Sequence, residues 1–179
     1  MIRFLSILLI LLGATYATVA QADRVSGEEY SVYSALINAR FSKSGTDSAI
    51  IQSRTGQHLI QAVTEFEKLL WAKNEKSYAL ERRFDIRVKY ALLDGQQLEQ
   101  MFGKGAEERD KGWGNYWEEH PHSTGLLTFS RVAFNSETSE AILSVSEMCG
   151  GLCGYGYLFR LKKDKGAWTV IEERTLWVS

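Results

Sequence analysis

The sequence predicts an α+β domain built on an antiparallel β-meander sheet, with N-terminal helices packed on one face of that sheet. Three observations predict this class. Two segments in the first half carry apolar residues at helical spacing, the last third holds four β-rich runs, and only short turns separate those runs. Because short turns join neighbouring antiparallel strands, the four runs form consecutive hairpins. One or two earlier strands complete the predicted sheet.

The composition limits the class of protein before any motif is considered. The chain has 179 residues, of which 45% are hydrophobic and 24% charged, with one Pro and two Cys. These values exclude collagen-like, disordered and disulfide-dense chains, and the length corresponds to about one domain. The formal net charge is −1, so the sequence predicts no nucleic-acid partner.

Residues 1–22 have the pattern of a cleaved secretory signal peptide. Arg3 precedes an apolar run, Phe4–Leu12, and the segment ends in Ala20-Gln21-Ala22. A retained membrane anchor needs about 20 consecutive apolar residues, and this run is shorter. The alternative is an N-terminal core helix. We therefore expect a signal peptide at 1–22 and a single α+β domain at 23–179, located in the periplasm or secreted, with no membrane span after cleavage.

The first elements of the mature chain are expected to be two helices with a strand between them. Ser26 and Glu29 form a capping box in front of a helix over Gly27–Phe41. A short strand follows at Ser48–Gln52. The apolar residues of Gln57–Trp71 then fall on one face of a second helix.

The middle of the chain combines one strand, one short helix and one loop in this interpretation. Alternating apolar and charged residues predict a strand over Phe84–Leu92. Asp94 and Gln97 resemble a second capping pair and begin a helix that runs through Phe102. Gly103–Gly114 contains four Gly and six charged residues without an apolar period, which predicts an exposed loop.

The four β-rich runs are Leu126–Asn135, Ala141–Met148, Gly154–Lys163 and Ala167–Val178. The turns at 136–138, 150–152 and 164–165 set the register, and paired residues share a face of the sheet. The expected pairs include Ala133 with Ala141 and Phe129 with Val145, then Val145 with Tyr157 and Ala141 with Leu161, then Leu161 with Trp168 and Phe159 with Val170. This shared face is apolar and aromatic except for Arg131 and Glu147, with Glu172 following in the fourth run.

The two cysteines enclose Gly150-Gly151-Leu152 between two of these strands. An oxidising compartment favours a disulfide, and Cys149 and Cys153 face each other across a three-residue hairpin loop at a distance that a disulfide can span. A zinc site needs about four ligands, and the chain has no second Cys pair. A catalytic dithiol and two reduced thiols are the alternatives.

An ordered run of motifs covers Gly112–Ser179. Its parts are Trp113-x-x-Tyr116, Pro121-x-Ser123-x-Gly125, Phe129-Ser130-Arg131-Val132-Ala133-Phe134-Asn135, Cys149-Gly150-x-x-Cys153-Gly154-x-Gly156-Tyr157, Gly166-x-Trp168 and Trp177-x-Ser179. This run resembles a family of small exported bacterial proteins of uncharacterised function. The resemblance implies export and a shared sheet, and it implies no reaction. The order of elements alone is similar to cystatin-like and NTF2-like folds, which is a likeness of shape and supplies no function.

Two charged residues on the apolar sheet face are the first candidate site. Unpaired charge is costly to bury, so Arg131 and Glu147 would orient a polar ligand if both point into a cavity, with Glu147 as the general base. In the alternative, Glu147 lies near solvent at the strand end and Arg131 extends past the helices.

The aromatic segment is the second candidate. Trp113, Tyr116 and Trp117 would form a stacking platform for a sugar or peptide, but the same spacing describes one short helix packed on the sheet. His120 and His122, beside two glutamates, are a weak alternative for a metal site, because a solvated loop explains them equally and His58 is far away in the sequence.

The chain contains no G-x-S-x-G elbow, H-E-x-x-H helix, phosphate-binding loop or dinucleotide fingerprint. We therefore expect no metal and no cofactor, and a non-catalytic domain that binds a small molecule or a protein partner. The binding residues we predict are Trp113, Tyr116, Trp117, Arg131 and Glu147, at the aromatic segment and the open end of the sheet. The alternative function is a small cavity enzyme, a hydrolase or isomerase, that uses Arg131 and Glu147.

Overall fold

The computed structural model describes residues 24–56 and 61–179, so the predicted signal peptide at 1–22 lies outside the described residues. The elements are α2 (Gly27–Leu36), the π-helix η1 (Ile37–Phe41), β1 (Ser48–Gln52), α3 (Glu65–Lys73), β2 (Lys89–Leu93), α4 (Gly95–Phe102), α5 (Ala106–Glu119), β3 (Ser123–Phe129), β4 (Ala133–Phe134), β5 (Glu140–Gly150), β6 (Cys153–Asp164) and β7 (Ala167–Val178). Within these ranges, no helix has the length and apolar character needed to cross a membrane.

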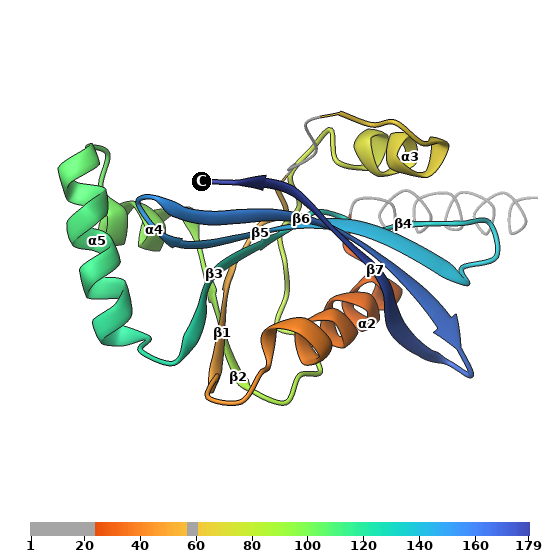
Figure 1. Cartoon of the computed structure of the whole chain (residues 1–179), viewed down its shortest axis with the longest axis horizontal. Coiled ribbons are helices and arrows are strands. Elements are labelled where there is room, and N and C mark those ends of the chain that lie inside the picture. Colours follow the sequence, from red (N-terminus) through yellow and green to blue (C-terminus); the bar gives the residue numbers. More distant parts are fainter. Residues whose placement is uncertain (1–23, 57–60) are drawn as a thin grey trace, which may run out of the picture.

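The sheet has the strand order β2-β1-β3-β5-β6-β7, and β4 also pairs with β5 (Figure 1). The α+β class and the antiparallel meander from β3 to β7 are confirmed. The prediction of a purely antiparallel sheet was wrong, because β1 pairs in parallel with both β2 and β3. Long connections that contain α3, or α4 and α5, separate these strands, and such crossovers bring strands together in parallel.

The predicted register is confirmed in the second hairpin and fails in part of the first. Val145 pairs with Tyr157 in the second hairpin. Phe129 pairs with Val145 as expected. However, residues 130–132 leave the sheet, so the predicted single strand divides into β3 and β4, and Ala133 pairs with Ile142 instead of Ala141.

The third hairpin is offset from its predicted register. Its turn residues are Lys165 and Gly166, with φ of 48° and 85°, which is the combination of a type I′ turn. Leu161 therefore pairs with Val170, and a bulge shifts the rest of β7. Glu173 then lies opposite Phe159, so Glu173 takes the sheet face that we predicted for Glu172.

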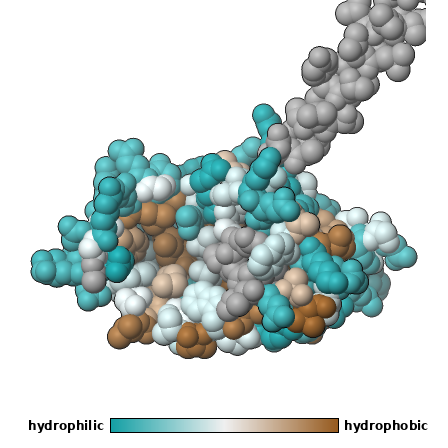
Figure 2. Space-filling model, turned by 90° about the horizontal axis from the view of Figure 1, so that it is seen from above, coloured by the Kyte–Doolittle hydropathy of each residue, from teal (hydrophilic) through white to brown (hydrophobic). Residues whose placement is uncertain are grey.

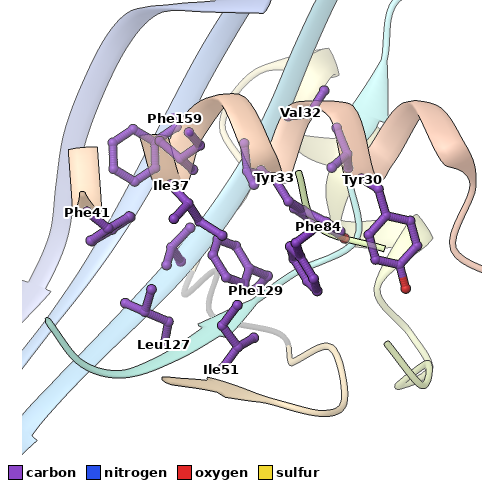
Figure 3. Close-up of a cluster of buried hydrophobic side chains, with 14 of the residues drawn as sticks. Tyr30, Val32, Tyr33, Ile37, Phe41, Ile51, Phe84, Leu127, Phe129 and Phe159 are labelled. Carbon is purple, nitrogen blue, oxygen red and sulfur yellow. The ribbon is translucent and has the colours of Figure 1, made fainter. Parts of the chain in front are cut away.

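The first helix follows the prediction closely. The Ser26 Oγ accepts from the Glu29 amide at 3.3 Å, and the Glu29 carboxylate accepts from the Ser26 amide at 2.9 Å, which completes the capping box. Side chains of α2 and η1 fill the space against the meander, where Tyr33 and Ile37 lie beside Phe129 (Figure 3). The predicted packing of this helix on the sheet is confirmed.

The other helices cover the opposite face, so the prediction that all helices lie on one face was wrong. Figure 1 places α2 below the sheet and α3 above it. Leu70 of α3 packs with Ile142 and Leu158, and a separate cluster joins Trp113 and Tyr116 of α5 to the strands through Ile50 and Leu126.

The second helix begins later than predicted. Residues 57–60 of the predicted helix Gln57–Trp71 lie outside the described residues, and 61–64 are not helical. Thr64 caps α3, because its side chain accepts from the Glu67 amide at 3.2 Å. With this start, Val63 and Leu69 are 69% and 56% exposed, rather than buried on one apolar face.

The predicted strand Phe84–Leu92 is reduced to β2, Lys89–Leu93. The Asp85 amide donates to Ser34 Oγ at 2.9 Å, and the Arg87 amide donates to Asn38 Oδ1 at 2.8 Å. Side chains of α2 and η1 therefore accept hydrogen bonds from backbone amides of this segment. These amides are then not available to pair with a neighbouring strand.

The segment predicted as an exposed loop, Gly103–Gly114, instead forms most of α5. Glu108 accepts hydrogen bonds from the amides of Lys104 and Gly105 at 2.8 Å each. Gly112 allows α5 to approach α4 closely, since a Cβ there would lie 2.4 Å from the carbonyl oxygen of Met101. The helix α4, capped by Asp94 and Gln97, is confirmed.

Two glycines of α5 should respond to alanine with opposite signs. Gly112→Ala forces its new methyl group against the α4 backbone, so we expect the free energy of unfolding to fall by about 1–3 kcal/mol. In Gly114→Ala the new methyl group has no atom within 4 Å, so the higher helix propensity of alanine should raise the free energy of unfolding by up to about 1 kcal/mol. Urea unfolding of both variants measures the difference, and equal effects would contradict the close α4–α5 contact.

Candidate functional site

The turn between β5 and β6 carries a disulfide. Cys149 and Cys153 are bonded, with their Cα atoms 5.0 Å apart, as the sequence predicted. The alternatives of a catalytic dithiol in its reduced form and of two free thiols do not describe this structure. We call residues 149–153 the clasped hairpin.

Further contacts hold the clasped hairpin from both sides. The Trp117 indole nitrogen donates to the Cys149 carbonyl at 3.1 Å. The Ser179 amide donates to the Gly154 carbonyl at 2.9 Å. Gly151 lies so close to α5 that a Cβ there would be 2.5 Å from Asp110 Oδ1. The turn is therefore fixed by α5 and by the end of β7 as well as by the disulfide.

Removing the disulfide should destabilise the protein moderately. For Cys149→Ser combined with Cys153→Ser, we expect a loss of about 2 kcal/mol, because so short a loop restricts the unfolded chain little. Thermal unfolding of the double variant and of the reduced natural protein, each compared with the oxidised natural protein, measures this loss. An unchanged melting temperature in both would show that the bond does not support the turn.

Leu152, at the centre of the clasped hairpin, has a side chain that is 93% exposed. Val178, near the end of β7, is 64% exposed and pairs with Tyr155 of β6. Figure 1 places the β5–β6 turn, α4 and α5 at one end of the molecule, and Figure 2 shows hydrophobic side chains at the surface of that end. This end therefore presents apolar groups on a rigid support.

The predicted aromatic segment contributes mainly to the core. Trp113 and Tyr116 are buried, and their rings pack with Phe102 at centroid distances of 4.7 and 6.2 Å. The Tyr116 hydroxyl lies 3.0 Å from Ser123 Oγ. Trp117 alone is half-buried, and it reaches the clasped hairpin. The first two residues match the packing interpretation, and Trp117 is the one placed at a surface.

Arg131 is buried in an ion pair that no sequence pattern indicated. Its Nε and Nη2 donate to the two carboxylate oxygens of Glu29 at 2.7 and 2.9 Å, and Nη2 also donates to the Arg24 carbonyl at 3.1 Å. Lys73 Nζ lies 3.6 Å from the same carboxylate. Burial opposes ionisation of Glu29, but the hydrogen bonds from Arg131 and the charge of Lys73 lower its pKa overall. Arg131 is therefore engaged with the first helix and does not meet Glu147.

Glu147 lies on the sheet face that α2 covers, between Leu127 and Tyr155. It is half-buried, and no described residue gives it a hydrogen bond or an ion pair. Burial raises the pKa of Glu147, the positive charges of Arg40 and Lys43 oppose this, and the charge of Glu173 adds to it. This carboxyl group is thus available to a ligand.

The neighbours of Glu147 include residues that sequence reasoning missed. Arg40 projects from η1, and its Nε lies 3.1 Å from both carboxylate oxygens of Glu173. The Arg40 guanidinium also lies over the Tyr157 ring, 5.2 Å from its centroid. The rings of Tyr155 and Tyr157 stack at 6.0 Å with 14° between their planes. We call Arg40, Glu147, Tyr155, Tyr157 and Glu173 the Glu147 cluster.

The two histidines do not assemble a metal site. The His120 ring packs on Tyr116 at a centroid distance of 5.1 Å, and its buried Nε2 has no hydrogen-bond partner among the described residues. His122 is exposed, and His58 lies outside the described residues. Across residues 24–56 and 61–179, no three His, Cys, Asp or Glu side chains are grouped to hold a metal ion.

The fold and the site define an α+β protein with a mixed sheet, a clasped hairpin and a polar cluster beside it. No protein-family model, no curated protein and no solved structure matches this chain. The resemblance to small exported bacterial proteins therefore remains a prediction.

Proposed function

We propose that this chain is an exported, non-catalytic domain that binds a partner protein through the clasped hairpin. The observation that carries the proposal is Leu152, which is 93% exposed in a turn fixed on both sides. An apolar side chain gains free energy when a partner's pocket covers it. A turn that is already rigid loses little conformational entropy on binding, so more of that gain appears as affinity.

The surroundings of Leu152 suit a protein better than a small molecule. Val178 is 64% exposed, and Trp117 and Tyr155 are half-buried nearby. Aromatic residues such as Trp and Tyr supply much of the binding energy at protein interfaces, and the exposed aliphatic side chains beside them add apolar area. A small molecule needs a concave site that encloses most of its surface. Leu152 instead projects outward, which favours a partner that supplies the pocket.

Export to the periplasm or the medium is part of the proposal. The pattern at 1–22 is that of a secretory signal, and disulfides such as Cys149–Cys153 persist in oxidising compartments. The alternative of a small cavity enzyme requires Arg131 and Glu147 to act on one ligand. The engagement of Arg131 with Glu29 supports the binding domain over that enzyme.

Photocrosslinking from the hairpin tests the proposal. A benzophenone amino acid replaces Leu152 in one variant and Val63 in a matched control, since Val63 is also apolar and 69% exposed. In the producing cells, we expect a discrete adduct from position 152 and none from position 63. The adducted protein, once purified, should bind the mature chain on its own. Equal adducts from both positions, or none from 152, would refute docking through the clasped hairpin.

A further inference from the structure

Glu147 is a half-buried carboxylate without a partner among the described residues, two positions before Cys149 in β5. Burying a charge without a hydrogen bond or an opposite charge is costly. Nothing in the packing of the core requires a carboxyl group here, because its same-face neighbours Leu127, Val145 and Tyr155 are apolar or aromatic. A costly group at a surface end of a sheet points to a ligand rather than to stability.

The Glu147 cluster already contains one bound guanidinium, which is that of Arg40. The Glu173 carboxylate accepts from Arg40 Nε at 3.1 Å, and the Tyr157 ring lies under the guanidinium at 5.2 Å. A carboxylate beside an aromatic face is a favourable site for a planar cation, since it combines a charge-assisted hydrogen bond with a cation–π contact.

Glu147 and Tyr155 repeat this combination of a carboxylate and an aromatic ring. The two residues are direct cross-strand partners, and the Tyr155 ring lies parallel to the Tyr157 ring at 6.0 Å. Arg40 is held by Glu173 and Tyr157 and forms no ion pair with Glu147, although its charge opposes the rise that burial causes in the pKa of that carboxyl group. Lys43 is exposed and forms no ion pair with any described residue. No cation of the described residues therefore forms an ion pair with Glu147, and the charges of Arg40 and Lys43 act on this carboxyl group only from a longer distance.

We propose that Glu147 and Tyr155 bind an arginine or lysine side chain of the partner protein that docks on the clasped hairpin. This inference rests on the proposed function, because it assigns the cation to the same partner. With a strand rise of about 3.3 Å per residue, Glu147 lies within about 15 Å of Leu152. A standard interface covers about 800 Å² per partner, an area wide enough to include both residues. The partner therefore presents an apolar pocket with a basic side chain next to it.

A titration with single amino-acid probes tests the cation site directly. N-acetyl-arginine amide is added to the mature, isotopically labelled protein at constant ionic strength, and amide NMR signals are followed. We expect saturable shifts at Glu147 and Tyr155. N-acetyl-citrulline amide has the same shape without the charge and should bind at least tenfold more weakly. Shifts of equal size with both probes would overturn the inference.

Variants separate a binding role for Glu147 from a structural role. Glu147→Gln should abolish the titration, whereas Glu118→Gln, at an exposed carboxylate of α5, should leave it unchanged. Lys43→Ala removes a nearby competing cation and should tighten binding. If Glu147→Gln keeps the full response, the assignment is wrong.

Stability gives an independent readout for Glu147→Gln. The pKa of Glu147 is raised in the folded state. The folded protein therefore becomes less stable as the pH rises from the unfolded-state pKa towards the raised folded-state pKa. The charged groups facing it are Arg40, Lys43 and Glu173. Glutamine removes this cost, so the variant should melt at the same or a higher temperature at pH 7. A lower melting temperature would contradict a site kept for binding.

The two proposals fail separately. Leu152→Asp should lose binding of the purified partner that crosslinking identifies, and it should keep the arginine titration. If the titration fails while crosslinking from position 152 succeeds, only the cation site is refuted. If the titration succeeds while crosslinking fails, the assignment of the cation to a partner protein is refuted, and Glu147 and Tyr155 would instead serve a free amine.

Discussion

Replacing Arg131 with leucine is expected to lower the free energy of unfolding by about 3–5 kcal/mol, a larger loss than we expect from Gly112→Ala or from removal of the disulfide. The substitution leaves the Glu29 carboxylate fully buried, with Lys73 Nζ at 3.6 Å as its remaining cation. It also removes the hydrogen bond from Arg131 to the Arg24 carbonyl. Urea unfolding at pH 7 measures the loss.

The pH dependence and a double variant provide the controls for Arg131→Leu. In the natural protein the lowered pKa of Glu29 contributes stability that is lost as the pH falls through that pKa. Without Arg131, burial would raise the pKa of Glu29, so the deficit of the variant should shrink in acid. The double variant Glu29→Leu/Arg131→Leu should recover much of the loss, since it leaves no buried charge. A deficit below about 1 kcal/mol would mean that the pair behaves like an exposed one.

Replacing Leu152 with aspartate should weaken binding of the crosslinked partner by about 100-fold or more, which is the size of a hot-spot effect. The substitution places a charge where the partner's pocket receives an apolar side chain. Because Leu152 is 93% exposed in the free protein, the melting temperature should not change. Titration calorimetry with the purified partner measures the affinity.

Val63→Asp is the matched control for Leu152→Asp. Val63 is 69% exposed and precedes α3, on a part of the molecule that the proposal leaves free. Its substitution should change the affinity by less than about twofold, in line with the near-neutral behaviour of residues away from a hot spot. Comparable losses from both variants would indicate that the added charge, and not the hairpin, weakens binding.

The part of the fold that could be predicted is the part fixed by local pattern. Alternation in β5 and β6, together with a turn closed by Cys149 and Cys153, determines one register, and that register is confirmed. The first part of α5, which was predicted as a loop, could not be recognised from the sequence, because its stability depends on contacts such as Gly112 against α4 that no local pattern contains. The sheet face on which Glu173 lies depends on a bulge in the β6–β7 pairing, and the alternation of apolar and polar residues in the sequence does not show where that bulge falls.

The candidate site shows the same division between local and distant information. Glu147 was identified because a charged residue interrupts an apolar face. The Glu147 cluster was not identified from the sequence, because Arg40 and Glu173 are 133 positions apart and meet only in the folded chain. Glu29 was recognised as a capping residue, a role usually found at the surface, so its pairing with Arg131 gave no signal. Leu152 carried no such signal, because a single apolar side chain at the surface is common, and only the folded chain shows that its turn is fixed on both sides.

Hydrogen–deuterium exchange with the purified partner tests docking through the clasped hairpin most directly. The amides of residues 149–155 should exchange more slowly when the partner is bound, because it covers the turn and the start of β6. Residues 61–73, which include the exposed side chains of Val63 and Leu69, should be unaffected. Protection confined to 61–73, or to any surface away from the β5–β6 turn, would contradict the account.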